Sequence, residues 1–211
     1  MNSKRKALTM VLCALLLVSA TMFATIAYLK SEDKVNNTFT VGDVKITLDE
    51  AKVNPDGTLV PDAERVDGNE YKLIPGHKYT KDPTVTVKNK SEDCYVRALV
   101  TITKRTALYN LPSSIKIKDC FDINENWVFK SETEDTVNDT YTYEFWYKEI
   151  VKTSDEDKTL PAIFTTITVP NSLTNDQLKT LDDLEINVVA HAIQADGFDT
   201  AEKAWEAFGN N

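Results

Sequence analysis

The chain has 211 residues, with 33 acidic and 24 basic side chains and a formal net charge of −9. Residues 1–27 contain three of the basic residues and no acid, so residues 28–211 carry a net charge of −12. This acidity makes nucleic acids and anionic membrane surfaces poor partners, because like charges repel. Only three cysteines, six glycines and seven prolines exclude a disulfide-rich miniature scaffold and a low-complexity disordered chain. What remains is one acidic globular domain behind a distinct N-terminal segment.

The N-terminal segment has the pattern of a secretory signal peptide. Three basic residues at positions 4–6 precede an uncharged, largely apolar run from Ala7 to Leu29. Small side chains near its end predict that residues 1–27 are removed by cleavage between Ala27 and Tyr28. The run is also long enough to span a bilayer, so a retained membrane anchor is the alternative. In both interpretations the rest of the chain is exported, and it meets the membrane only through this segment.

The exported part has the pattern of β-strands. Apolar and polar residues alternate in several stretches that are rich in β-branched and aromatic side chains, as half-buried strands require. In chain order these stretches are residues 39–48, 84–88, 95–103, 141–147, 162–169 and 185–195. Many short alternating strands separated by turn residues predict two stacked antiparallel sheets. We therefore predict an all-β fold, an antiparallel jelly-roll β-sandwich over residues 42–211.

Two short helices are expected among these strands. Thr174 and Gln177 have the spacing of a capping box, which predicts a helix over residues 176–184. A second such box at residues 199–202 predicts a short C-terminal helix. Its apolar residues form one stripe, which suits either a lid packed on the sheets or a partner-binding helix.

Two cysteines, Cys94 and Cys120, lie in the exported part. In an oxidising compartment they could form a disulfide that closes a loop of about 26 residues, worth roughly 3 kcal/mol. Two separate buried thiols are the alternative, and the sequence leaves both open because it does not give the distance between the two Cα atoms.

Three stretches occur in a specific order along the chain. The first is Ala27–Leu29 with the Asn-rich link Asn36–Gly42, the second is Pro75–Val85 leading to Cys94–Arg97, and the third is Ala192–Phe198 followed by Ala201–Trp205. In this order and spacing they resemble the TasA/camelysin family of Gram-positive bacteria. The resemblance runs from the export signal to the terminal helix and so covers essentially the whole chain.

The resemblance implies a secreted jelly-roll protein that is a subunit of biofilm matrix fibres. It also implies an export signal that a SipW-type signal peptidase removes, and partners that are copies of the same chain and a companion matrix subunit. Subunits of such fibres join by donor-strand complementation, in which the segment after the signal adds to the sheet of the next subunit. The matching segment is residues 28–41, and a flexible stalk is the alternative role for it. Its donor-strand candidates are Tyr28, Leu29, Val35, Phe39 and Val41.

The sequence suggests two alternative functions, a peptidase and a surface-binding module. Camelysin-like relatives suggest a secreted metal-dependent peptidase, but the chain has only two histidines, His77 and His191, and lacks a His-Glu-x-x-His motif. Four aromatic residues alternate over residues 141–147, and exposed rings of this kind would suit a cell-surface adhesion or carbohydrate-binding module. Packing in the core is the simpler role for those rings. The sequence predicts no catalytic residue, no metal site and no cofactor.

Overall fold

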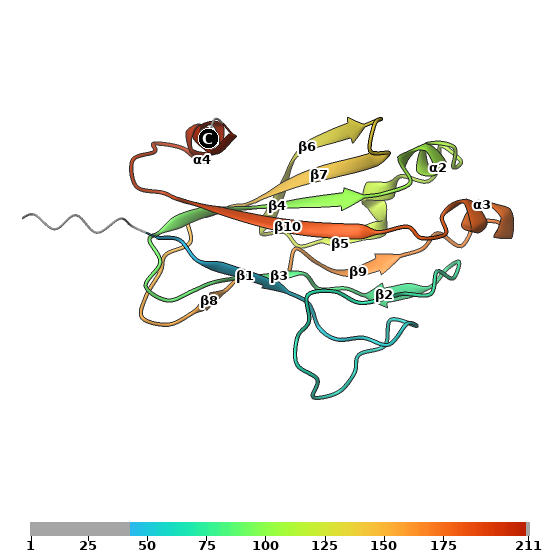
Figure 1. The fold of residues 1–211 in the computed structure, drawn as a ribbon, viewed down its shortest axis with the longest axis horizontal. Helices are drawn as coiled ribbons and strands as arrows, with labels where there is room; N and C mark the ends of the chain where they lie inside the picture. Colours follow the sequence, from blue (N-terminus) through green and yellow to red (C-terminus); the bar gives the residue numbers. More distant parts are fainter. Residues whose placement is uncertain (1–42, 210–211) are drawn as a thin grey trace, which may run out of the picture. The chain divides into compact units, whose positions relative to one another are not determined.

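The computed structural model describes residues 43–209, which belong to one compact unit of the chain, Gly42–Asn211. The predicted signal peptide, the cleavage site between Ala27 and Tyr28, and the donor-strand candidates of residues 28–41 lie outside the described residues. The described part consists mostly of strands in antiparallel pairs, with few short helices, as the all-β prediction requires. The strands form two layers (Figure 1).

The first layer is a four-stranded sheet with the order β10-β4-β7-β6. Its strands are β10 (Ile186–Gln194), β4 (Cys94–Ile102), β7 (Thr140–Tyr147) and β6 (Trp127–Asp135). Each neighbouring pair is antiparallel, so β10 and β6 are the two edge strands.

The second layer consists of two short sheets joined end to end. Backbone bonds from Lys81 N to Thr165 O (3.1 Å) and from Ile163 N to Pro83 O (3.0 Å) bridge the join. Through them β2 continues into β3, and β8 continues into β9, so the layer behaves as one sheet of four long strands. The strands are β1 (Ile46–Asp49), β2 (Lys78–Thr80), β3 (Thr84–Val87), β5 (Phe121–Ile123), β8 (Lys158–Thr159) and β9 (Phe164–Thr168).

One apolar core lies between the two layers. Every second residue of β4 is buried from Cys94 to Ile102, so one face of this strand points inward. Val85 of β3 and Phe164 of β9 are fully buried from the opposite layer. This packing explains the alternating sequence pattern, because one face of each strand excludes water and the other does not.

The aromatic residues of β7 belong to this core. Tyr141, Tyr143 and Phe145 are 7%, 4% and 2% exposed, and burial raises the pKa of Tyr143 well above its usual range. A sugar-stacking surface would need several of these rings open to solvent. The idea of a carbohydrate-binding platform on this strand is therefore wrong.

Among the described residues, three short helical segments lie between strands, and a fourth follows the last strand. The capping box at Thr174 is confirmed, with the hydroxyl of Thr174 accepting from Gln177 N, although the helix ends earlier than predicted. Within residues 43–209, no helix is long and apolar enough to cross a membrane. The segments are α2 (Arg105–Tyr109), η1 (Ile117–Cys120), α3 (Asn175–Thr180) and α4 (Ala201–Gly209).

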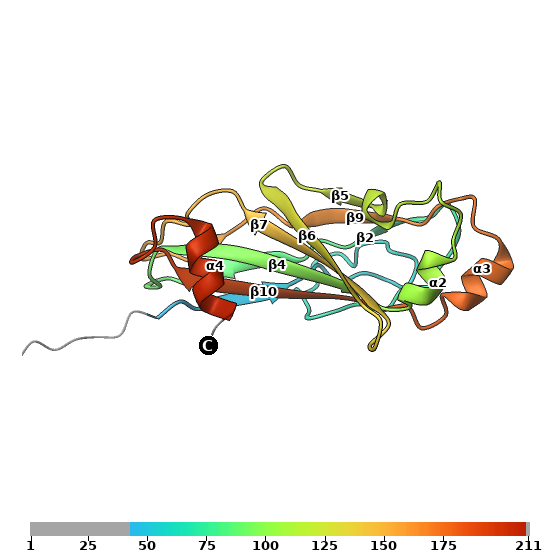
Figure 2. The same ribbon diagram turned by 90° about the horizontal axis from the view of Figure 1, so that it is seen from above.

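The C-terminal helix α4 lies across the outer face of the first layer (Figure 2). Its N-terminal cap is Thr200, whose hydroxyl accepts from Lys203 N at 3.3 Å. Ala204 and Trp205 are buried, so the predicted apolar stripe serves as a lid on the sheet. The Trp205 ring stands 4.5 Å from the guanidinium carbon of Arg97 on β4, a cation–π contact that anchors the helix.

Candidate functional site

The outer edge of β10 has no partner strand among the described residues. Flanking ladder bonds, from Thr103 N to Glu185 O (3.1 Å) and from Ala195 N to Asp93 O (2.7 Å), set the phase in which β10 bonds to β4. Because bonding alternates along an antiparallel strand, the even-numbered residues 188–192 direct their N–H and C=O groups away from β4. These groups form a free strand edge that can pair with an added strand.

A groove of about 1140 Å³ opens beside this edge, between β10 and the β1 side of the second layer. Leu48 of β1 lines one wall, and Ile186 and Val188 of β10 line the other. The inward-facing residues of β10 are only half-buried, whereas their ladder partners on β4 are about 1% exposed or less. Among residues 43–209, nothing therefore covers the core on this side.

The rim of the groove is polar and mainly acidic. The connection between β1 and β2 and the turn after α3 supply most of its charged side chains. The acidic residues are Asp49, Glu50, Asp67, Glu70, Asp182, Asp183 and Glu185, and the basic residues are Lys72, Lys81 and Lys179.

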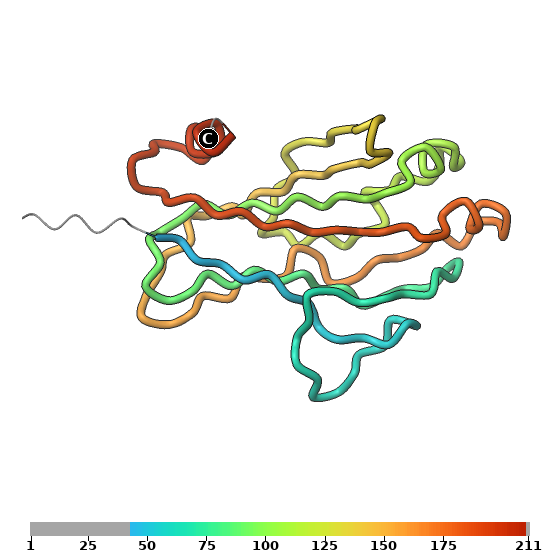
Figure 3. Tube along the Cα trace, viewed as in Figure 1, coloured from blue at the N-terminus to red at the C-terminus, as the bar shows by residue number. Residues whose placement is uncertain are grey.

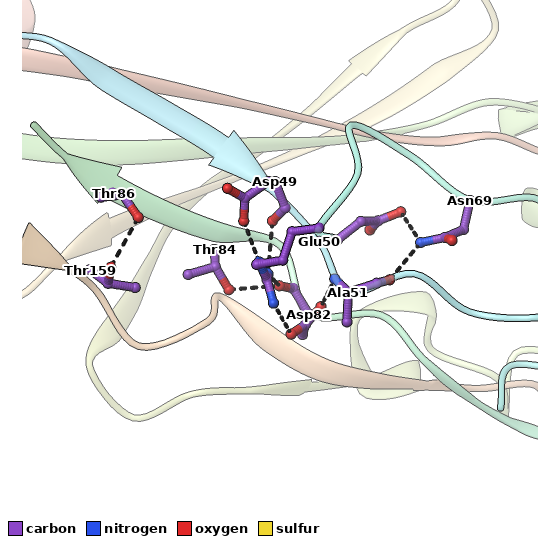
Figure 4. A network of polar contacts seen from close by, with 9 residues as sticks. Asp49, Glu50, Ala51, Asn69, Asp82, Thr84, Thr86 and Thr159 are labelled. Atoms are coloured by element: carbon purple, nitrogen blue, oxygen red, sulfur yellow. Dashed lines mark hydrogen bonds and ion pairs between the residues drawn. The ribbon is translucent and has the colours of Figure 1, made fainter. Parts of the chain in front are cut away.

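The long connection between β1 and β2, which projects below the sheets in Figure 3, is fixed by a polar network. Arg65 pairs with Asp49 and donates to Asp82 Oδ2 at 2.9 Å. Ala51 N donates to the other carboxylate oxygen of Asp82 at 2.6 Å (Figure 4). The network ties residues that are far apart in sequence to the start of β3, and so it shapes one end of the groove.

Glu50 is the most buried acid of this network. Its carboxylate accepts from Lys81 Nζ at 2.7 Å and from Asn69 Nδ2 at 2.9 Å, with the second bond drawn in Figure 4. Glu50 is 3% exposed and Lys81 is 8% exposed. A buried charge needs such a partner, because removing it from water without one costs several kcal/mol.

The two histidines do not form a shared site. His77 Nε2 bonds to Asp56 O at 2.6 Å in a turn, and His191 lies under α4 and accepts from Arg97 Nε at 3.2 Å. Across residues 43–209, no group of three His, Cys, Asp or Glu side chains is placed to hold a metal ion. No site in the described part therefore favours the metal-dependent peptidase.

Cys94 and Cys120 are separate free thiols in this structure. Cys94 begins β4 in the core, and burial raises the pKa of its thiol to about 11. Cys120 ends η1, and burial raises the pKa of its thiol as well. Both groups are therefore protonated and unreactive near neutral pH.

No spacing or motif in the sequence links Glu50, Asn69 and Lys81, so their contact could not be predicted from it. The free edge of β10 could not be predicted either, because it follows from the strand order.

Comparison with known proteins adds no relative. No protein-family model, curated protein or solved structure matches the chain. The groove and the free edge of β10 are therefore the features of the molecule that indicate a function.

The contact between His191 and α4 predicts a pH dependence of stability. Burial, and then the positive charge of Arg97, lower the pKa of His191 below its ordinary 6.5, although Glu144 opposes the shift. The unfolded chain therefore binds a proton that the folded protein excludes, and the free energy of unfolding should fall as the pH drops below about 6.5. Urea unfolding at about pH 7.5 and pH 5.5 measures this. In His191→Gln, which cannot titrate, the fall should be smaller, and an unchanged fall would assign it to other groups.

Proposed function

We propose that this protein is an exported structural subunit of extracellular matrix fibres, and that its copies join by donor-strand complementation. The observation that carries this proposal is the free edge of β10 beside a groove that has apolar side chains on its walls and an acidic rim. An added strand obtains affinity from main-chain hydrogen bonds and specificity from alternate side chains that enter the groove. The half-buried residues of β10 and β1 would then gain the cover that they lack.

Residues 28–41 of a second copy are the proposed donor. In an extended strand alternate side chains share a face, so Leu29, Val35, Phe39 and Val41 would all point into the groove. An extended segment of this length reaches roughly 45 Å, and the nine residues of β10 span roughly 30 Å. The donor is therefore long enough to cover the whole free edge.

The opposite edge of the same sheet is unsuited to this role. Strand β6 has a register shift between Phe129 and Ser131, and its charged residues Lys130, Glu132 and Glu134 are exposed. Bulges and charges on an edge strand oppose pairing with another chain. One receptive edge and one donor segment per copy give a head-to-tail interface, which builds an open filament rather than a closed dimer.

The strand order supports the finer assignment of a jelly roll. Counting β2 with β3, and β8 with β9, as single strands gives eight strands in the described residues, which we number 1 to 8 in chain order. In this numbering, neighbouring strands follow 8-3-6-5 in the first layer and 4-7-2-1 in the second. The two Greek keys of a jelly roll give the same circular order of neighbours, with the sheets divided one strand further along. The groove lies at one of these divisions, between the first and the last strand.

The proposal includes the relationship to the TasA/camelysin family. In this view a SipW-type signal peptidase removes residues 1–27 between Ala27 and Tyr28, and the new N-terminus begins the donor segment. The partners are then copies of the same chain and a companion matrix subunit. The strand-rich fold and the open groove are compatible with this role.

A proline on the free edge of β10 tests the proposal. Ala190→Pro removes an N–H group that points toward the added strand and leaves the bonds to β4 in place, since proline is tolerated on edge strands. Mature Ala190→Pro should remain a folded monomer and form no fibres by electron microscopy. Ala190→Ser keeps the N–H group and should assemble as the parent does. Normal fibres from Ala190→Pro would remove β10 as the acceptor.

A further inference from the structure

A carboxylate, an amine and a side-chain amide form a hydrogen-bonded cluster beside the groove. Glu50 lies between Lys81 and Asn69 and bonds to the nitrogen of each, at 2.7 Å and 2.9 Å. The amide of Asn69 is also held by the backbone, because Val53 N donates to its Oδ1 at 2.9 Å and its Nδ2 donates to Ala51 O at 2.9 Å. The Lys81 amine and the Asn69 amide therefore contact the same carboxylate, and the amide is fixed in orientation.

The surroundings of this cluster exclude most water. The ring of Tyr71 lies 5.8 Å from Lys81 Nζ and packs edge-on against Tyr79, with 5.6 Å between ring centroids. Burial raises the pKa of Tyr71 well above its usual range. Lys81 Nζ is in direct contact with the Glu50 carboxylate, so a proton has a short path between the two groups.

We propose that Lys81 and Asn69 join through an intramolecular isopeptide bond, with Glu50 as the catalytic residue that carries the proton. The nucleophile is an amine, which must lose its proton before it attacks. Glu50 can accept that proton from Nζ and return it to Nδ2, since it contacts both nitrogens. Val53 N–H is placed to stabilise the negative charge that develops on Asn69 Oδ1.

The reaction balances without a cofactor or an oxidant. Lys81 Nζ gives a proton to Glu50, and its lone pair forms a bond to the side-chain carbonyl carbon of Asn69. The bond from that carbon to Nδ2 then breaks as Glu50 returns the proton to the departing nitrogen. The products are a secondary amide and ammonia, and the second proton of the attacking nitrogen passes to Glu50, which is left as a neutral carboxylic acid. No atom is oxidised or reduced.

The bond would be a covalent cross-link in the wall of the groove. It closes a ring between residues 69 and 81, and so links the connection after β1 to the start of β3. It would also replace a buried ion pair by a neutral amide, which removes the desolvation cost of two charges. In a fibre subunit under mechanical load, this cross-link would resist extension of the chain beside the binding groove.

Intact mass spectrometry of the folded mature protein tests the proposal. The expected mass is lower than the sequence requires by one ammonia, about 17 Da. Tryptic digestion should yield one branched peptide in which Val66–Lys72 is joined to Tyr79–Lys88, since trypsin cannot cleave after an acylated Lys81. The branched peptide distinguishes the bond from loss of ammonia at a single asparagine.

Two variants separate chemistry from packing. Glu50→Gln removes the proton carrier, and Lys81→Arg keeps the positive charge beside Glu50 but removes the nucleophile. Both should have the full sequence mass and no branched peptide, and circular dichroism should report a folded domain for Lys81→Arg. A folded parent protein with the full sequence mass and an intact cleavage site after Lys81 would overturn the proposal.

Discussion

Deletion of residues 28–41 is expected to abolish fibre formation and to leave the domain folded. The deleted segment precedes the described residues, and residues 43–209 form a continuous apolar core cluster among themselves. Without the segment each copy still has a free edge on β10 but has no strand to offer. The shortened protein should stay in the supernatant after ultracentrifugation and show no filaments by electron microscopy.

A synthetic peptide provides the matched control for this deletion. The peptide with the sequence of residues 28–41 should bind the shortened protein at a ratio of one to one and raise its thermal midpoint, because a ligand that binds only the folded state stabilises it. A peptide with Phe39→Asp and Val41→Asp places charges against the apolar wall and should not bind. Undiminished fibres from the shortened protein would show that the segment is only a flexible stalk.

Much of the first layer could be predicted because its sequence pattern reflects one buried face. In β4 and β7 each inward position is apolar and each outward position is polar or half-exposed, so the alternation reports the fold directly. The capping box at Thr174 is equally local, because its bonds join residues three apart. Such features need no knowledge of the rest of the chain.

Strand β6 could not be predicted in this way. After Trp127 its side chains are mostly exposed, and the register shift near Lys130 breaks the alternation. The strand is held by its ladder to β7, where Trp127 pairs with Tyr147. Tertiary pairing rather than local pattern therefore decides this element.

The candidate sites were beyond sequence reasoning for a related reason. Asn69 lies 19 positions from Glu50 and Lys81 lies 31 positions from it, and neither separation has a meaning until β1, β2 and the connection between them fold together. The free edge of β10 likewise depends on which strand occupies the neighbouring position. The sequence of β10 alone, with its alternating Val188, Ala190 and Ala192, reads the same for a central strand as for an edge strand.

A mixture of two assembly-defective variants should form a closed pair. The protein without residues 28–41 has a free β10 edge and no donor, and Ala190→Pro has a donor and a blocked edge. Each variant alone should be monomeric. Mixed in equal amounts, they should form a one-to-one complex and no larger species, measured by size-exclusion chromatography with light scattering.

This stoichiometry separates strand donation from other modes of association. A lateral contact between domain surfaces would be present in both variants, so each would self-associate alone and the mixture would not stop at two copies. Filaments from the mixture would mean that a second interface also carries assembly, and two unmixed monomers would mean that β10 does not accept the segment. A stable pair assigns one donor and one acceptor to each subunit, which is the condition for an unbranched fibre.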